Sequence, residues 1–385
     1  MDSLTEKKET KMMKMTIERA ALLKSLSHIQ SVVERRQTIP ILSNVLLEST
    51  PDNGGTLLLR ATDNEIEISD KIPAKIEQAA SLTVSAHKLY DVVKKLPEGA
   101  DVRFECEGDG AQLQVTSGRS RFALATIPAE GFPTMQIEQA ASTFSLPAGV
   151  LADLIERTQF AASTEETHYN LNGLYMHEKE GEKHLLKVAA TDGHRLATAE
   201  IEAPEGVSGM PAVIIPRKTI GELTKLLVET DGNVEVSVSQ NQVRFSLGDV
   251  ILASRLIDGS YPVYERVIPE GNDKFLEVDS AALITLVDRV AVIFEKSRGI
   301  KLQLKKGFLT VTASNTEEGM AEDEMEAGYD GEPLEVGFNY RYLLDILAQI
   351  KGGTVRFSLK DAMAPVVLQD ANDTTALYVL MPMRV

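Results

Sequence analysis

The sequence predicts an α+β fold in which one type of domain occurs three times along the chain. Each third begins with a short alternating strand that turns into a helix-spaced apolar pattern, first at Met15 and again at Phe144 and Leu276. Several alternating strands, a second helical pattern and more strands follow each time. The repeat is far longer than the roughly 20–50 residues of a solenoid unit, so each copy is a whole domain. We expect a disordered extension at 1–12 and domains at 13–138, 139–270 and 271–385.

The two helical patterns keep their register from copy to copy. In the first pattern, apolar residues such as Ala21 and Leu22 recur at helical spacing. In the second, an acidic residue recurs at Asp91, Glu222 and Asp345. The expected helices span 19–31, 86–96, 148–160, 217–227, 280–292 and 339–351. After each second helix, a turn containing glycine leads into an alternating strand.

Composition restricts the classes of function. The chain has 385 residues and one cysteine, so it forms no internal disulfide, and a reducing cytoplasm is the expected location. Cys106 lies in the alternating run 102–106, which favours a strand residue over a nucleophile. No apolar run is long enough to span a bilayer, and the start has no signal-peptide pattern. We therefore expect a cytoplasmic protein of several domains with no membrane association.

Charge is unevenly distributed along the sequence. The net charge of −17 by itself disfavours nucleic acid as a partner. The six expected helices nevertheless hold 12 Lys and Arg residues against six Asp and Glu residues. Basic helices on an acidic body would focus positive potential on one surface, which suits a DNA duplex touched only through its phosphates. Charge alone leaves a second interpretation equally open, because Lys and Arg are also good helix formers on solvated faces.

The only compact polar group is Asp192, His194 and Arg195 in the stretch 190–197 (ATDGHRLA). An Asp-Gly pair after an alternating run predicts a hairpin turn. Related stretches that lack the His and the Arg occur at 61–66 (ATDNEI) and 313–317 (ASNTE). A structural turn is therefore favoured over an active site, and a binding contact is the economical role for the added His and Arg. The six histidines show no metal-ligand spacing, and no Gly-rich phosphate loop or nucleophile elbow occurs.

Six motifs together carry a specific resemblance. They are 38–42 (TIPIL), 118–122 (GRSRF), 190–197 (ATDGHRLA), 215–218 (IPRK), 261–262 (YP) and the terminal 381–385 (MPMRV). In this combination the chain closely resembles the bacterial sliding clamp family, the β subunit of the replicative DNA polymerase III, over about 13–385. The resemblance implies three DNA-clamp domains, each with two helices and two antiparallel sheets, in a head-to-tail homodimer that closes as a ring. It also implies a processivity factor that encircles duplex DNA without sequence specificity and tethers the polymerase.

The resemblance assigns roles to individual residues. Contacts to double-stranded DNA would come from Arg36, His87, His168, Tyr169, Arg217 and Lys218. A pocket for short peptides of the replicative polymerase, the clamp loader and repair or translesion polymerases would be lined by Leu171, Thr191, Gly193, His194, Arg195, Leu196, Pro262, Arg266, Val267, Tyr342, Pro365, Val379, Leu380, Met381, Pro382, Met383 and Arg384. The dimer interface would include Arg119, Arg121 and Leu124. His87 and His168 depart from the family pattern, since relatives usually carry a basic residue there and an ordinary histidine is mostly uncharged at neutral pH.

Three hypotheses of function follow. The leading one is a clamp and binding hub with no catalytic residue, cofactor or metal. The second is an enzyme whose site contains Asp192, His194 and Arg195. The third is a repeat-built scaffold that binds proteins and never DNA. An image of a ring-shaped particle with a central hole would exclude both alternatives.

Overall fold

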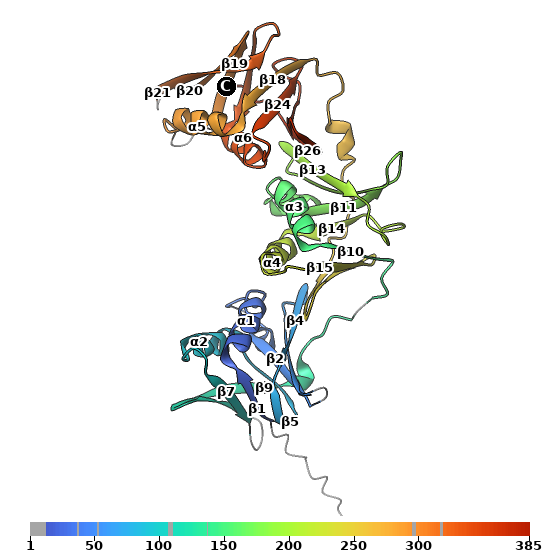
Figure 1. Ribbon diagram of the computed structural model, residues 1–385, viewed down its shortest axis with the longest axis vertical. Helices are drawn as coiled ribbons and strands as arrows, with labels where there is room; N and C mark the ends of the chain where they lie inside the picture. Colours follow the sequence, from blue (N-terminus) through green and yellow to red (C-terminus); the bar gives the residue numbers. More distant parts are fainter. Residues whose placement is uncertain are drawn as a thin grey trace, which may run out of the picture. The chain divides into compact units, whose positions relative to one another are not determined.

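The computed structural model describes residues 13–36, 38–51, 54–106, 111–136, 138–294, 298–315 and 319–385, which Figure 1 traces in sequence order. The expected extension at 1–12 and the end of the stretch at 313–317 lie outside these residues. Each predicted copy contains a strand, a helix, several strands, a second helix and three more strands. The predicted α+β class with a threefold repeat is therefore confirmed.

The first repeat shows how sequence periodicity becomes packing. Met13, Met15 and Ile17 alternate on the first strand and are all buried, and Leu22 and Leu26 form the buried stripe of the first helix. The elements are β1 (Met13–Glu18), α1 (Arg19–Ile29), η1 (Pro40–Ser43), β2 (Asn44–Thr50), β3 (Thr56–Thr62), β4 (Ile66–Pro73), β5 (Lys75–Gln78), β6 (Ser81–Ser85), α2 (Ala86–Lys95), β7 (Asp101–Cys106), β8 (Gln112–Ser117), β9 (Ser120–Pro128) and η3 (Ala129–Gly131).

The second repeat has the same order of strands and helices. Its core strands alternate in the same way, with Phe144 and Leu146 buried on the first of them. The elements are β10 (Ser142–Pro147), α3 (Ala148–Gln159), η4 (Glu166–Leu171), β11 (Gly173–Lys179), β12 (Leu185–Thr191), β13 (Arg195–Glu202), β14 (Val213–Pro216), α4 (Arg217–Val228), β15 (Asn233–Val238), β16 (Gln242–Leu247), β17 (Val250–Arg255) and η5 (Tyr264–Val267).

The third repeat differs from expectation at its second helix, which ends at Leu347 where the sequence predicted 351. The backbone N–H groups of Gln349 and Ile350 bond carbonyls three residues back, so the helix tightens and stops. The elements are β18 (Lys274–Asp279), α5 (Ser280–Ala291), β19 (Gly299–Lys305), β20 (Phe308–Asn315), β21 (Gly319–Glu326), β22 (Gly328–Tyr329), β23 (Leu334–Asn339), α6 (Tyr340–Leu347), β24 (Thr354–Leu359), β25 (Val366–Asp370) and β26 (Asp373–Leu380).

Each repeat contains two four-stranded antiparallel groups, and groups of neighbouring repeats fuse edge to edge. In the first repeat the groups are β1, β7, β8, β9 and β2, β3, β4, β6. Strand β17 of the second repeat pairs with β4 of the first, and β26 of the third pairs with β13 of the second. The described strands therefore form sheets of 13, nine and four strands, a fusion that the sequence did not predict.

Two compact units result from this pairing. The first contains the chain up to Ala148 together with Gly221–Arg255, and it holds the 13-stranded sheet. The second contains Gly149–Ile220 together with Leu256–Val385, and it holds the nine- and four-stranded sheets. The compact units therefore do not coincide with the sequence repeats, because the second repeat is divided between the two units. The domain boundaries at 138/139 and 270/271 stay a prediction.

Candidate functional site

The predicted hairpin joins β12 to β13, and its side chains are bonded to the turn itself. Gly193 lies at the tip with a φ of +87°, which glycine adopts without strain. Oδ1 of Asp192 accepts hydrogen bonds from the backbone N–H of His194 at 2.9 Å and of Arg195 at 3.0 Å. The Thr191 hydroxyl donates to the Arg195 carbonyl at 2.6 Å and accepts from the Gly193 N–H at 3.1 Å. Asp192 is therefore a turn residue.

The related stretch in the first repeat forms the same turn between β3 and β4. The Thr62 hydroxyl donates to the Ile66 carbonyl at 2.8 Å and accepts from the Asn64 N–H at 3.0 Å. Oδ1 of Asp63 accepts from the N–H groups of Glu65 and Ile66 at 2.9 and 2.7 Å. Asn64 takes the place of the glycine with a φ of +77°, a conformation that asparagine tolerates. The Thr-Asp pair is thus a shared structural device, as the recurrence of the motif predicts.

Arg195 has partners for all three of its guanidinium nitrogens. Nε donates to Oδ2 of Asp192 at 3.1 Å, Nη1 to Oδ2 of Asp345 at 2.5 Å, and Nη2 to the Phe160 carbonyl at 2.7 Å. The guanidinium carbon lies 4.4 Å from the ring centre of Tyr342 and 5.1 Å from that of Phe160. The side chain is only 9% exposed. Arg195 therefore links β13 to the residue after α3 and to α6.

The end of the chain runs beside this hairpin. Leu380, the last residue of β26, lies opposite Arg195 in the strand pairing. The Met381 N–H donates to the His194 carbonyl at 3.0 Å. The exposed His194 ring stacks beside Tyr342, with their centres 6.1 Å apart. The hairpin, α6 and the start of the tail thus meet at one place in the second unit.

Exposed apolar side chains gather around that place. Met381 and Met383 are each 41% exposed and Val267, at the end of η5, is 49% exposed. Below them Leu196 and Val379 pack with Tyr264, the first residue of η5, in one buried cluster. Grouped exposed apolar side chains over a rigid floor are typical of a surface that binds another molecule.

The structure places every residue predicted for the peptide pocket in the second unit. Exposed are Gly193, His194, Pro262, Arg266, Val267, Met381, Met383 and Arg384; half-buried are Leu171, Thr191, Arg195, Tyr342, Pro365 and Pro382; buried are Leu196, Val379 and Leu380. The buried residues belong to the floor and do not reach a ligand without rearrangement. Lining of a pocket by this set stays a prediction.

The sequence did not predict a layer of aromatic side chains that packs under this surface. The Tyr264 hydroxyl lies 2.9 Å from Nε2 of His177, whose Nδ1 lies 3.0 Å from the Glu178 carbonyl. Because that carbonyl only accepts, Nδ1 carries a proton and Nε2 accepts from the tyrosine when the ring is neutral. Burial lowers the pKa of His177 and raises that of Tyr264. Tyr175 and Tyr261 stack beside them with ring centres 4.5 Å apart. No motif joins these residues, and only the packing of η5 and the segment before it against β11 brings them together.

Four of the residues predicted to contact DNA lie close together in the second unit. His168 and Tyr169 are exposed on η4, and Arg217 and Lys218 are exposed at the start of α4. The Arg217 N–H donates to the Asn172 carbonyl at 3.1 Å, which ties the helix start to the end of η4. Two cations in a first helical turn oppose the helix dipole, at a cost of about 0.3–1 kcal/mol each, so their position favours a role in binding anions.

The other two lie in the first unit. Arg36 is exposed after α1. His87 is half-buried, with Nε2 at 2.8 Å from the Val33 carbonyl and Nδ1 at 3.0 Å from Oε1 of Gln30. Both ring nitrogens of His87 thus have partners on the segment that follows α1. Contact of these six residues with DNA stays a prediction.

The residues predicted for the dimer interface lie at the end of β8 and along β9. Arg119 is exposed in the turn between the two strands, and Arg121 and Leu124 lie on β9, opposite Thr116 and Leu113. Residues 126–128 at the far end of β9 pair with β6, and the recorded pairs of 120–125 are with β8 alone. This stretch of β9 is therefore the edge of a sheet within the described residues, although its role in a dimer stays a prediction.

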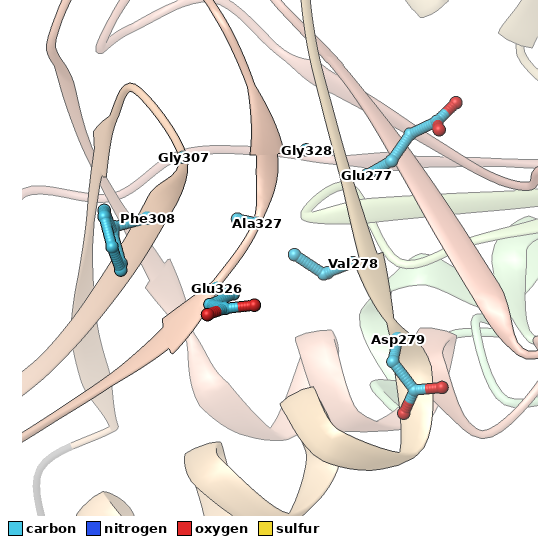
Figure 2. Close-up of a pocket in the computed structure, with 8 residues that line it drawn as sticks. All are labelled: Glu277, Val278, Asp279, Gly307, Phe308, Glu326, Ala327 and Gly328. Carbon is cyan, nitrogen blue, oxygen red and sulfur yellow. The ribbon is translucent and has the colours of Figure 1, made fainter.

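A cavity of about 500 Å³ in the third repeat was not expected from the sequence (Figure 2). Its lining consists of Glu277, Val278, Asp279, Gly307, Phe308, Glu326, Ala327 and Gly328. Oδ1 of Asp279 caps α5 by accepting from the Ala282 N–H at 2.7 Å, and Oε1 of Glu277 accepts from Nε of Arg356 at 2.7 Å. Two of its three carboxylates thus have structural partners, and we assign the cavity no role.

Three further expectations concern single features. Cys106 is a buried residue of β7, as its alternating run predicts. In the described part of the chain, no group of three His, Cys, Asp or Glu side chains is arranged to hold a metal ion. None of the described helices has the length and apolar character needed to cross a membrane.

Three copies of one α+β domain, joined edge to edge by antiparallel strands, define the DNA clamp class of protein. Comparison with known families supports this. The models of the N-terminal, central and C-terminal domains of the DNA polymerase III beta subunit match residues 13–136, 145–263 and 265–384. The chain belongs to this family, the beta sliding clamps, which are processivity factors of DNA polymerase III.

Relatives match along nearly the whole chain. The beta sliding clamp of Caulobacter vibrioides is 49% identical over 375 residues, and that of Escherichia coli 39% over 374, each covering 97% of this chain and 100% of the relative. The solved sliding clamp of Caulobacter crescentus has a TM-score of 0.92 at 49% identity, covering 97% of this chain and all of that one. A Bartonella birtlesii clamp bound to griselimycin has a TM-score of 0.93 at 45% identity, with the same coverage.

Proposed function

We propose that this protein encircles duplex DNA as a homodimeric ring and tethers polymerase, clamp loader and repair or translesion polymerases through one peptide-binding surface. Membership of the sliding clamp family over nearly the whole chain carries the proposal. A ring that holds DNA by topology needs only weak, sequence-independent phosphate contacts, since tight contacts would stop sliding.

The edges of the sheets support a head-to-tail dimer. Within the chain, the last strand of one repeat pairs with the strand that follows the hairpin of the repeat before it, as β17 does with β4 and β26 with β13. By the same rule β9, the last strand of the first repeat, would pair with β21, the strand that follows the corresponding hairpin of the third repeat. Arg119, just before β9, and Arg121, on β9, would meet the acidic side chains of β21, which include Glu322, Asp323 and Glu324. Pairing of these two edges between copies closes a ring of six domains.

The peptide-binding surface is proposed where the tail meets the hairpin. Methionine side chains adapt their shape, so Met381 and Met383 suit a surface that several partners share. Val267 and Pro262 on the η5 side would complete the apolar contact. We propose the same surface for griselimycin, because a relative of 45% identity is bound to that ligand. Single short peptides on such a surface typically bind near micromolar, about −8 kcal/mol.

No catalytic role is proposed for the hairpin. The Asp192 carboxylate accepts from two backbone N–H groups and from Arg195, and Arg195 in turn has three partners. A general base or an anion-binding arginine needs a free lone pair or donor for its substrate. We propose a cytoplasmic, non-catalytic subunit whose His194 and Arg195 shape a binding surface.

Retention on DNA tests the proposal. The protein, loaded on a nicked circular plasmid by its clamp loader, should stay bound through gel filtration and dissociate once the plasmid is linearised. Reversing the charges with Arg217→Glu and Lys218→Glu should weaken loading and shorten retention, whereas Lys360→Glu on an exposed turn of the same unit serves as the control. Equal loss from circular and linear DNA would contradict the ring. Retention unaffected by the double reversal would remove these two residues from the DNA contact.

A further inference from the structure

Met383 and Val385 lie against β23, the edge strand of the four-stranded sheet. The Met383 N–H donates to the Gly337 carbonyl at 2.9 Å. With the bond from the Met381 N–H to the His194 carbonyl at 3.0 Å, the tail is attached at two points on two different sheets of the second unit. The exposed methionine side chains are therefore carried by a backbone that is fixed on both sides of Pro382.

Two glycines lie where the tail comes closest. Gly337 on β23 and Gly299 on β19 belong to the same face of the sheet, because Gly337 pairs with Lys301 and side chains alternate along each strand. A Cβ atom on Gly337 would lie 2.3 Å from the Met383 carbonyl oxygen and 2.6 Å from Cγ2 of Val385. A Cβ atom on Gly299 would lie 2.6 Å from Cγ1 of Val385. Neither position has room for a side chain while the tail is in place.

Backbone conformation does not explain these glycines. Neither Gly299 nor Gly337 has a positive φ, so an alanine could adopt either backbone conformation. Glycine inside a strand weakens it, and a close approach by another segment is the usual reason to find one there. Here that segment is the tail, and the side chain it lays over the two glycines is that of Val385.

The other repeats show that the backbone bond alone does not require glycine. Gly337 stands three residues before the start of the second helix of its repeat, a position held by Ile214 in the second repeat and Thr83 in the first. In the second repeat the Ile257 N–H donates to the Ile214 carbonyl at 2.9 Å, as Met383 does to Gly337. Glycine is thus required by the course of the tail after Met383, where the Val385 side chain lies over the sheet.

We propose that Gly299 and Gly337 are positioning residues of the peptide-binding surface. They form a seat for the Val385 side chain, and the seated tail holds Met381 and Met383 in the arrangement that a partner peptide meets. This inference rests on the proposed function of the surface. It gives two residues of the third repeat an indirect role in partner binding. Both residues lie in the four-stranded sheet, whereas the hairpin belongs to the nine-stranded sheet.

Glycine-to-alanine substitutions test the seat, with griselimycin as the probe and its dissociation constant measured by calorimetry. Gly337→Ala forces the Met383 backbone to move, and we expect about tenfold weaker binding. A Cβ on Gly299 comes closer than 3.0 Å only to Cγ1 of Val385, so the double variant Gly299→Ala with Val385→Ala should bind more tightly than Gly299→Ala alone. Val385→Ala should not rescue Gly337→Ala, because the Met383 carbonyl remains in the way. Gly149→Ala in α3 is the matched control, since a Cβ there meets nothing within 4 Å and its φ is not positive.

The outcomes separate this inference from the proposed function. If the unsubstituted protein fails to bind griselimycin, the proposed surface is wrong. If it binds and Gly337→Ala binds within twofold of it, the seat is wrong. Carbon-13 labelled methionine methyl groups give a second readout, because Met381 and Met383 should shift in Gly337→Ala and keep their positions in Gly149→Ala. Weak binding with unchanged methionine signals and a lower melting temperature would show general destabilisation and overturn the positioning role.

Discussion

Replacing Arg195 by alanine should destabilise the second compact unit, because this side chain links three segments. The bond from Nη2 to the Phe160 carbonyl joins a charged donor to a backbone acceptor and contributes about 1.5–3 kcal/mol. The contacts with the rings of Tyr342 and Phe160 add about 0.5–1 kcal/mol each. The Asp345 side chain is 47% exposed, so its ion pair adds only about 0–1 kcal/mol.

Such contributions are not fully additive, and we expect a loss near the low end of their sum, about 3 kcal/mol. In a unit of this size, 1 kcal/mol lowers the melting temperature by about 2–4 °C, so Arg195→Ala should melt about 6–12 °C lower. Calorimetry measures this. Arg289→Ala is the control in the same unit, since Arg289 pairs with a single carboxylate of the described residues, that of Asp323, and is 65% exposed, and it should cost about 0–1 kcal/mol. If both variants melt within about 2 °C of each other, Arg195 contributes no more stability than an exposed ion pair, and the linking role is refuted.

Two further predictions concern the tail and a buried histidine. Deleting 381–385 should abolish griselimycin binding in calorimetry and leave the dimer intact in analytical ultracentrifugation, because β26 ends before the tail begins; loss of the dimer as well would make the tail structural. In the first unit, burial lowers the pKa of His28, but the neighbouring carboxylates of Asp70 and Glu229, at 3.5 and 3.2 Å from its ring nitrogens, outweigh burial and raise the pKa above its usual value. A group whose pKa is higher in the folded state stabilises the fold fully at a pH below its unfolded-state pKa. This stabilisation is lost as the pH rises through the folded-state pKa. The urea midpoint of the first unit should therefore fall more between pH 6 and pH 8 in the unsubstituted protein than in His28→Gln, and equal falls would contradict the linkage.

Periodic patterns predicted the local structure well, because the apolar spacing of a helix or a strand can be recognised from neighbouring residues alone. The six helices and the Thr-Asp turn around Asp192 were predicted in this way. The turn was identified by its recurrence at Asp63, although glycine was replaced by Asn64 there. Pairing between distant strands has no local signal, so the fusion of β4 with β17 could not be predicted. For the same reason the contact of His177 with Tyr264 was missed.

The structure also changes the interpretation of individual site residues. Arg195 was expected to line a pocket, and its guanidinium proves to be occupied by protein partners. Its side chain depends on Asp345 and Phe160, which are far away in sequence and carry no motif. Gly337 looks like any strand glycine in the sequence, and only the position of the tail gives it a reason. Contacts made by tertiary packing therefore set the limit of prediction at this site.

The hairpins of the first and second repeats differ in what lies beside them, and this difference supports the proposed binding surface at the second. The two joints are built alike: the Met381 N–H bonds the His194 carbonyl at 3.0 Å, and the Arg255 N–H bonds the Glu65 carbonyl at 2.9 Å. After Arg255 the chain continues into the next segment, and the Arg255 side chain itself donates from Nε to the Asn64 carbonyl at 3.1 Å.

At the joint of the second repeat, by contrast, the side chains of Met381 and Met383 are each 41% exposed. The tail can therefore offer its methionines to another molecule, provided that something holds it in place. In the second repeat, Ile214 accepts the equivalent backbone bond from Ile257, whereas in the third repeat Gly337 accepts it from Met383. The tail supplies the exposed methionines, the proposed glycine seat fixes them, and the His194 carbonyl aligns the tail with the hairpin. In this proposal, a joint that occurs twice in the chain becomes a binding surface through the tail and the two glycines of the last repeat.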